Sequence, residues 1–322
     1  MSPAVVMGAE VCTSLGLDLD TTALEIEAGT QRVEDTPVLD VGGEPARAAR
    51  LAVLPPGHGR VRRMAALGVT ALRPLVEALL RAGQARVALY LGLPTEDDLP
   101  ATEASGVLSA LRAAAAPLQL VLPRRGVYAA GRAAAFLALE GAMQQLDQGA
   151  IDMALVGAVD CLCDTGSLVE LVARRELLGP ANIEGRLVGE GAGFLWLASE
   201  RQALPRGLVP PRVLGVATGR EPRRTGPAPS LGEGLTVVMR ALRRDPHAGR
   251  LATDRMLSCQ TDQGHWNTEL SWAYLRNAAL FPEPFEPEHL PAALADTGAA
   301  AGAIALAVAT RAKHGAAPAS RT

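Results

Sequence analysis

Aromatic side chains are scarce in this sequence of 322 residues, where Phe, Trp and Tyr together make up 3%. A core with so few large rings must be assembled from Ala, Val and Leu in closely packed helices and strands. Almost every basic residue is arginine, with Lys313 the single lysine, and the net charge of −3 provides no overall positive field. We therefore expect no binding to nucleic acid.

Long hydrophobic runs are absent as well, since none reaches the roughly 20 residues that a membrane span needs. The N-terminus has no basic segment followed by an apolar one, so no signal peptide is predicted. The chain has four cysteines and no Cys-x-x-Cys pair; they are Cys12, Cys161, Cys163 and Cys259. Scattered thiols in a chain of this size are typical of a reducing compartment, and we expect a cytoplasmic protein.

Neither a metal nor a cofactor is predicted from these cysteines. Cys161 and Cys163 lack a second pair to complete a zinc site, and a metal or redox role for them is the alternative. Cys259 ends a predicted buried strand and is expected to be an inert core thiol.

Short apolar runs alternate with longer Ala- and Leu-rich stretches, which predicts the α/β class. Strands are predicted at residues 4–12, 86–92, 119–123, 152–159, 193–198, 211–217 and 255–260, and helices at 61–82, 106–116, 131–147, 234–244 and 302–313. Pro74 should kink or restart its helix. Residues 281–291, rich in Pro and Glu, should be irregular.

The order strand, helix, strand, helix occurs twice along the chain. The start of one Ala-rich helix, at 131–136, resembles the start of another, at 298–303. An internal duplication explains this likeness, and chance similarity between Ala-rich helices is the alternative. We predict an N-terminal half at residues 1–203 and a shortened C-terminal half at 204–322, whose polar tail is expected to be disordered.

The most informative segment is Gly189-Glu190-Gly191-Ala192-Gly193, which leads into the apolar run 194–198. Three glycines within five residues allow backbone angles and close approaches that a Cβ forbids, so we predict a turn and then a buried strand. A generic glycine-rich turn is the alternative. The segment resembles the GEGAG signature of β-ketoacyl synthases, the condensing enzymes of the thiolase fold.

Other segments agree with this resemblance, which extends over about residues 3–312. They are residues 4–16, the helix from Gly131 with the strand 152–160, residues 178–180, and residues 297–304. The resemblance implies two pseudo-repeated βαβαβ halves with the Ala-rich helices buried between their sheets. It also implies a two-fold dimer, in which the predicted edge strand 119–123 pairs across the axis.

A ketosynthase of this family uses a Cys thiolate at a helix N-terminus, two histidines or a His and an Asn, and a lysine. The resemblance assigns Tyr128 to the nucleophile, Gln263 to the first histidine, Asp296 to the second and Pro291 to the lysine. A phenol with a pKa near 10 is a poor acyl acceptor. An anionic Asp296 would repel a developing enolate. His265, two residues after Gln263, is the candidate for a displaced catalytic histidine.

Each assigned residue also has a simpler interpretation. Tyr128 fits a core or interface aromatic, His265 a loop residue, and Asp296 a helix N-cap. If the assignment holds, the Tyr128 ring should point into a residual acyl tunnel near Asp296 and residues 262–265. The pair Arg223-Arg224 is predicted in a loop, either solvated or touching an acidic carrier protein or a phosphopantetheine phosphate.

These residues predict a ketosynthase-like protein that does not condense acyl groups and acts as a partner subunit or an acyl- or carrier-binding protein. Relatives of the chain-length-factor kind lack the cysteine and persist as dimer partners, which favours this hypothesis. The expected partners are a second copy or a ketosynthase, and an acyl carrier protein. An active acyl transferase or hydrolase that uses His265 or Asp296 as a base is the alternative. A passive ligand-binding protein is a third hypothesis.

Overall fold

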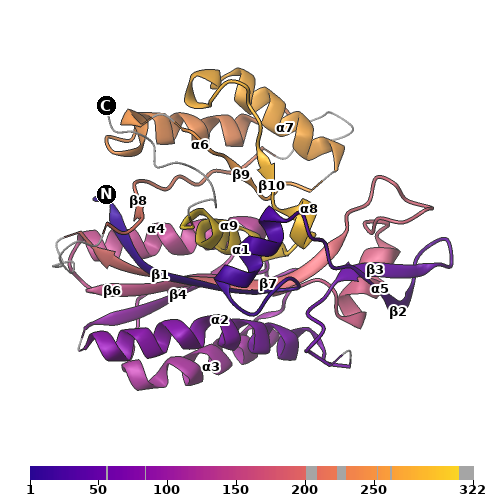
Figure 1. Cartoon of the computed structure of the whole chain (residues 1–322), viewed down its shortest axis with the longest axis horizontal. Helices are drawn as coiled ribbons and strands as arrows, with labels where there is room; N and C mark the ends of the chain where they lie inside the picture. The colour runs from indigo at the N-terminus through magenta and orange to yellow at the C-terminus, as the bar shows by residue number, and fades with distance from the viewer. Residues whose placement is uncertain are drawn as a thin grey trace.

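The computed structural model describes residues 1–55, 57–83, 85–200, 209–222, 230–251, 253–261 and 263–311. Within them, a mixed eight-stranded sheet forms the centre of the molecule (Figure 1). Its strands are β1 (Ala4–Thr13), β2 (Glu34–Leu39), β3 (Pro45–Ala49), β4 (Val87–Leu93), β5 (Val127–Ala129), β6 (Met153–Cys161), β7 (Val188–Ser199) and β8 (Arg212–Val213).

The long strand β7 organises this sheet. The strand order is β2, β3, β7, β6, β4, β5, and β1 pairs with both β7 and β8. Strand β7 runs antiparallel to β6 and β1, whereas β4 runs parallel to β6 and β5. A separate pair of short parallel strands, β9 (Leu257–Ser258) and β10 (Glu288–His289), lies in the C-terminal half.

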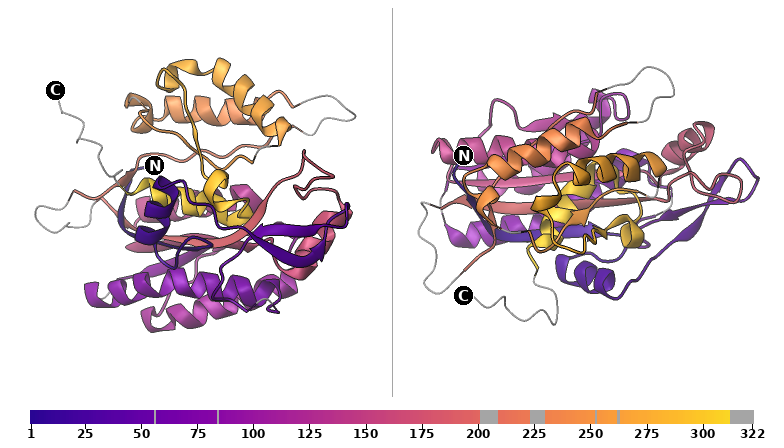
Figure 2. Two further views of the ribbon diagram at one scale, coloured as in Figure 1. Left: turned by 45° about the vertical axis from the view of Figure 1, so that its right-hand side comes forward. Right: turned by 90° about the horizontal axis from the view of Figure 1, so that it is seen from above.

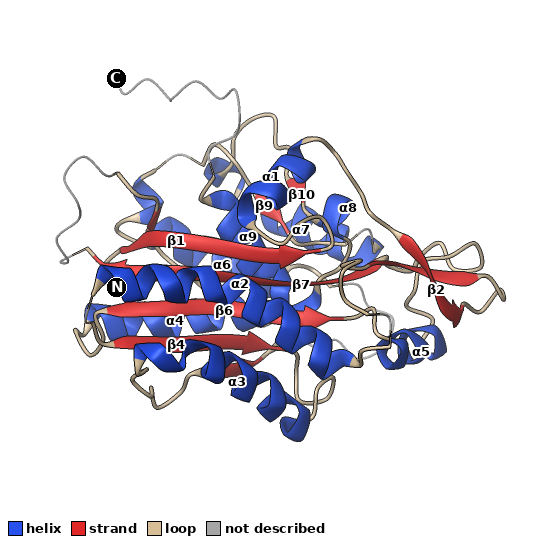
Figure 3. Ribbon diagram, turned by 60° about the horizontal axis from the view of Figure 1, so that its bottom comes forward, coloured by secondary structure: helices blue, strands red, loops and turns tan. Residues whose placement is uncertain are grey.

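Helices α2 (Arg60–Ala82) and α3 (Ala101–Ala115) cover one face of the sheet (Figure 3). The Ala-rich helices α4 (Ala134–Asp147) and α9 (Ala301–Ala309) lie on the other face, next to α1 (Leu19–Glu27) (Figure 1). Helices α6 (Glu233–Arg244) and α7 (Gly264–Leu275) form a further layer outside α4 and α9 (Figure 2). Two further short helices are α5 (Thr165–Ala173) and α8 (Pro291–Leu294).

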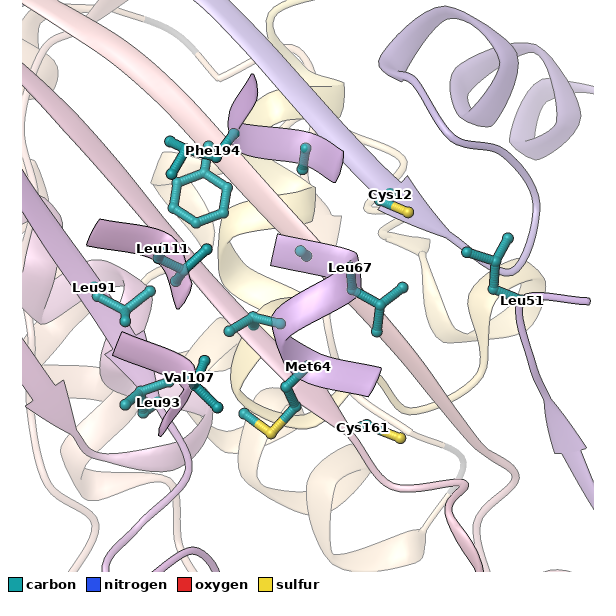
Figure 4. Packing of buried hydrophobic residues seen from close by; sticks show 14 of the residues in the cluster. Cys12, Leu51, Met64, Leu67, Leu91, Leu93, Val107, Leu111, Cys161 and Phe194 are labelled. Carbon is teal, nitrogen blue, oxygen red and sulfur yellow. The ribbon is translucent and has the colours of Figure 1, made fainter. Parts of the chain in front are cut away.

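The main core fills the space between the sheet and α2 and α3. Figure 4 shows Met64 and Leu67 of α2 in this cluster, together with strand residues such as Cys161 and Phe194. Helix α2 continues past Pro74 as one helix, so of the two predicted alternatives, a kink or a restart, the restart is wrong; the helix itself is confirmed. On the opposite face, α4 buries Leu139, Met143 and other residues that share one side of the helix, as the apolar spacing predicts.

Small residues let the Ala-rich helices approach the sheet closely. Helix α9 is buried along almost its whole length, and Gly302 lies so near α4 that an added Cβ would come 2.8 Å from the Phe136 ring. The α/β class and the burial of both Ala-rich helices are therefore confirmed.

Two local predictions are wrong. Residues 119–123 do not form a strand: Gln119 has a positive φ of 50°, and Val121 makes only an isolated bridge to Ala88. The strand at that edge is instead β5, which pairs with β4. The predicted glycine-rich turn at 189–193 lies inside strand β7, where none of the three glycines has a positive φ.

The C-terminal half has less sheet than predicted. The predicted strands 211–217 and 255–260 shorten to β8 and β9, two residues each. Helix α7 occupies a segment for which no element is predicted, and it contains His265, interpreted above as a loop residue. The sequence gives little sign of this helix, because its apolar period is weak and only Leu270 and Ala273 are buried. The proposed boundary at 203/204, the C-terminal tail and the pair Arg223-Arg224 lie outside the described residues. None of the described helices is both long and apolar enough to cross a membrane.

Candidate functional site

The glycines of β7 form a stripe along the face covered by α8 and α9. A Cβ on Gly189 would lie 2.7 Å from the Leu294 carbonyl oxygen, and one on Gly193 would lie 2.7 Å from the Ile304 amide nitrogen. A Cβ on Gly191 would meet the Ile304 side chain at 2.8 Å. Because residues two apart share a face of a strand, the three glycines together make room for the helix.

Glu190 lies between these glycines and points to the other face, where α2 packs. Its carboxylate and the Arg63 guanidinium form a fully buried ion pair, with a bond from Arg63 Nε of 2.7 Å, and both side chains are 0% exposed. The Leu51 amide donates a further hydrogen bond of 2.8 Å. Burial alone would raise the pKa of Glu190, but these bonds and the Arg63 charge outweigh it and lower the pKa.

Cys161, Cys163 and Glu190 form the one group among the described residues with metal-ligand chemistry, with ligand atoms within 4.8 Å of one another. The Glu190 carboxylate already accepts bonds from Arg63, Leu51 and the Cys161 thiol. Burial raises the pKa of Cys163, which keeps that thiol protonated. The group is therefore best described as a buried polar cluster held by Arg63, because a metal would have to displace a satisfied ion pair.

A second buried carboxylate, Asp296, precedes the turn that starts α9. Its side chain is 0% exposed and forms ion pairs with Arg132, from the turn before α4, and with Arg186, which also pairs with Glu176 at 2.6 Å. The other carboxylate oxygen accepts the Gly298 amide at 2.9 Å, in agreement with a capping role. Asp296 is thus held by two guanidinium groups and one backbone amide.

Asp160 at the end of β6 supports the same turn from the other side. It accepts the Ala299 amide at 2.9 Å and pairs with Arg60 at 2.9 Å. Gly298 has a positive φ of 55°, and a Cβ there would collide with the Asp160 carboxylate. Burial raises the pKa of Asp160 despite the Arg60 charge. The turn 296–299 is therefore fixed by two carboxylates, one on each side.

Tyr128 lies apart from this cluster. Its ring packs against Tyr90 and Gly141, and the Arg125 guanidinium lies 4.8 Å from the ring centre. Gly141 is seven residues after the first residue of α4, a rise of about 10 Å along the helix. The expected direction of the Tyr128 ring, toward Asp296, is wrong. The hydroxyl fits where Gly141 has no side chain, so the ring is a core aromatic, and burial raises its pKa.

Gln263 and His265 lie at the start of α7. Gln263 is the N-cap residue and its side chain lies 3.3 Å from the Thr261 hydroxyl. His265 is exposed and its ring centre is 4.7 Å from that of Trp266. Trp266 in turn lies 5.5 Å from the Arg132 guanidinium, a cation–π distance. His265 therefore approaches the Asp296 cluster only through Trp266.

Cys259, from the end of β9, borders the same cluster. Its carbonyl oxygen accepts a bond of 3.1 Å from Arg132. Burial raises the pKa of the thiol to about 11; the Arg132 charge lowers it, and the Asp296 charge raises it by less. Only about one thiol in ten thousand would be ionised at pH 7, so Cys259 is a weak nucleophile.

The side chain that meets Asp296 from the start of α4 is Arg132, which sequence reasoning overlooked together with Arg186. A guanidinium stays protonated and cannot accept an acyl group. The sequence did contain a sign of this role. Arg132 directly follows Gly131 at the start of an Ala-rich helix. A charged side chain at the end of such a buried helix needs a polar partner. The cluster can bind and orient oxygen atoms, and it lacks an ionised thiol among the described residues.

No family model and no curated protein sequence matches the chain. Solved structures do match. A chain of a type II polyketide synthase acyl carrier protein–ketosynthase complex has a TM-score of 0.75 at 17% identity, covering 96% of this chain and 85% of the other. A ketosynthase in complex with its chain length factor from Xenorhabdus doucetiae has a TM-score of 0.68 at 18% identity, covering 94% and 82%.

A third match is the module 6 ketosynthase of the bacillaene synthase from Bacillus subtilis 168, with a TM-score of 0.66 at 15% identity. The alignment covers 96% of this chain but 61% of that ketosynthase, so the chain spans about three fifths of its length. The ishigamide ketosynthase/chain length factor matches over 90% of its length at 20% identity. The chain therefore has the thiolase-like α/β fold of ketosynthases and chain length factors.

Proposed function

We propose that this protein is a non-condensing, ketosynthase-like subunit that acts by pairing with a ketosynthase or with a second copy of itself. The observation that carries the proposal is the Arg132–Asp296–Arg186 ion-pair cluster at the start of α4. A condensing enzyme of this fold needs an ionised thiol at that helix start and neutral hydrogen-bond donors for the oxyanion. Here a permanent cation and a buried carboxylate take up the space.

The alternative, a rearranged acyl transferase or hydrolase, has less support. Asp296 would have to act as a base, yet its carboxylate is held by two arginines and is fully buried. His265 is exposed and stacks on Trp266, with no hydrogen bond to Asp296 among the described residues. A base needs a partner to orient it and a position close to the reacting proton.

The edge strand β5 supports the pairing part of the proposal. Leu91 donates its amide to the Gly126 carbonyl, and the Ala130 amide donates to Leu93, so these residues face β4. Alternate residues of a strand point their amides to opposite sides, and Val127 and Ala129 therefore face the open edge. Unpaired amides at a sheet edge favour pairing with a strand of another chain. The ketosynthase and chain length factor complexes named above are assemblies of this kind of subunit.

An acyl carrier protein is the other proposed partner. Helix α6 and the turn after it expose Arg240, Arg243, Arg244 and Arg250, none of which has an ion pair within the described part of the chain. An acidic carrier would be attracted to this basic face.

Intact-mass analysis tests the absence of condensation. The full chain is incubated with a malonyl thioester and with acyl donors, and decarboxylation is followed in parallel. We expect neither an acyl adduct nor carbon dioxide release, from the native chain and equally from Tyr128→Cys and Arg132→Cys, because Asp296 would still oppose the oxyanion. An adduct on the native chain, mapped to Cys259 or another residue, would favour the rearranged enzyme instead.

A further inference from the structure

A large apolar cavity separates the layer of α4 and α9 from the outer helices α6 and α7. Its volume is about 940 Å³, which lies within the range of small-molecule sites. Its walls are mostly aliphatic and aromatic and come from β1, α4, β7, α6, α9 and the segment after α7. Among the lining residues are Phe136, Leu139, Leu235, Val238, Met239 and Phe281. An apolar space of this size is costly to leave filled with water, and it favours an apolar occupant.

The cavity exists because the C-terminal half has lost most of its sheet. Strand β8 ends at Val213, and the following residues 214–219 line the cavity without strand partners. Leu214 and Val216 thus contribute side chains to a wall instead of to a sheet. The cavity arises from this shortened sheet, and it does not depend on a partner subunit.

One end of the cavity is polar. Arg132, Cys259, Gln260 and Trp266 line it there, beside the Asp296 cluster. The indole Nε1 of Trp266 is buried and has no hydrogen-bond acceptor among the described residues. A buried donor without an acceptor costs free energy, so a ligand oxygen there would be favourable.

Arg132 adds further donors at this end. A guanidinium has five N–H groups, and the described residues accept from it at Cys259 and Asp296. Its side chain is 25% exposed, so donors remain within reach of the cavity. Arg132 therefore presents N–H donors at this end, with its charge paired to Asp296, while most of the lining is apolar. Two carboxylates also line the cavity: Glu269 and Glu221, which accepts the Glu233 and Gly234 amides.

We infer that this cavity binds one single-chain amphiphile, with its hydrocarbon chain along α4 and α6 and a carboxylate or carbonyl oxygen at Trp266 and Arg132. The apolar walls favour a hydrocarbon chain, and the indole N–H without an acceptor favours an oxygen atom in the head group. The Arg132 guanidinium disfavours a cationic head group. This site goes beyond the partner role proposed above, because the protein would bind the amphiphile without a second subunit.

Calorimetric titration of the full chain with laurate, below its micelle concentration, tests the site. We expect saturable binding with a stoichiometry of one, no binding of acetate, and at least tenfold weaker binding of dodecyltrimethylammonium, which has the same chain with a cationic head. Trp266→Phe removes the indole donor and should weaken laurate binding about 3–10-fold, the effect of one hydrogen bond.

A matched pair of variants on α6 tests the wall. Val238 lines the cavity, whereas its neighbour Val237 does not and is 59% exposed. Val238→Trp should fill the chain site and weaken laurate binding at least tenfold, while Val237→Trp should leave it unchanged; circular dichroism checks that both fold. The inference is overturned if the native chain shows no saturable binding, if both tryptophan variants bind alike, or if both head groups bind equally.

Discussion

Glu190 and Asp296 are both fully buried carboxylates, and each is neutralised by arginine rather than by lysine or histidine. A planar guanidinium can meet two oxygens at once and remains charged when buried. Burying a charge is expensive unless it is paired and hydrogen-bonded. Glu190 therefore depends on Arg63, and Asp296 on Arg132 and Arg186 together.

Replacing Glu190 by Gln tests the Arg63 pair. The variant leaves a fully buried guanidinium without its counter-charge, and we expect the free energy of unfolding to fall by about 3–5 kcal/mol. Urea unfolding at pH 7 and one fixed protein concentration measures this. Glu184→Gln, in an exposed loop, is the matched control and should change stability little. A loss below about 1 kcal/mol for Glu190→Gln would contradict the role given to this pair.

The same pair gives a pH dependence. Because the folded-state pKa of Glu190 is lowered, its contribution is present above the ordinary value of about 4.5 and is lost as the pH falls through the lowered pKa. Glu190→Gln should therefore lose less stability than the native chain between pH 5 and pH 2.

At the scale of elements, β7 combines two different requirements in alternating residues. The face toward α9 needs no side chains at Gly189, Gly191 and Gly193, whereas the other face supplies Glu190 to α2. A period of two is what allows one strand to satisfy both helices.

Gly193→Ala tests the close approach of α9. Its Cβ would lie 2.7 Å from a backbone nitrogen, which cannot rotate away, and we expect a loss of about 1–3 kcal/mol in the free energy of unfolding. Gly264→Ala is the control, since a Cβ there meets nothing within 4 Å. Equal stability of the two variants in thermal unfolding would show that the helix can move aside.

Ala129→Pro tests the edge strand. Its amide faces away from β4, so the subunit should fold, but an incoming strand would lose a hydrogen bond and meet the ring. We expect the native chain to sediment as a dimer at micromolar concentration, Ala129→Ser to behave likewise, and Ala129→Pro to shift toward monomer. A native monomer would rule out self-pairing through this edge.

At the scale of the whole molecule, charge is distributed unevenly among the layers. Residues 209–251 contain eight arginines and three acidic residues, a net charge of +5 in a chain whose total is −3, so the remainder carries −8. Within the described part of this segment, α6 and the turn after it expose Arg240, Arg243, Arg244 and Arg250. Helix α2, on the opposite side of the sheet, is basic as well, with five arginines and one acidic residue.

The exposed arginines of α6, which have no ion pair within the described part of the chain, predict where an acidic carrier protein binds. Arg240→Glu combined with Arg244→Glu should weaken the complex at least tenfold, and raising the salt concentration should weaken the native complex too. Arg112→Glu, on the exposed face of α3, changes the same kind of charge on the far side and should have little effect. Equal binding by the two charge-reversed proteins in a titration would refute α6 as the docking face.

The sequence by itself determined the α/β class, the Ala-rich helices and the close packing at Gly189–Gly193, because periodicity and small side chains are local properties. It also indicated that the usual nucleophile is missing. The tertiary structure alone decided that Arg132 and Arg186 meet Asp296, since 164 and 110 residues, respectively, separate them from it. It likewise decided that Tyr128 is a core aromatic and that the shortened C-terminal sheet leaves a cavity. Ion pairs and cavities depend on which segments, far apart in the sequence, come together in the fold, and no local sequence pattern predicts that.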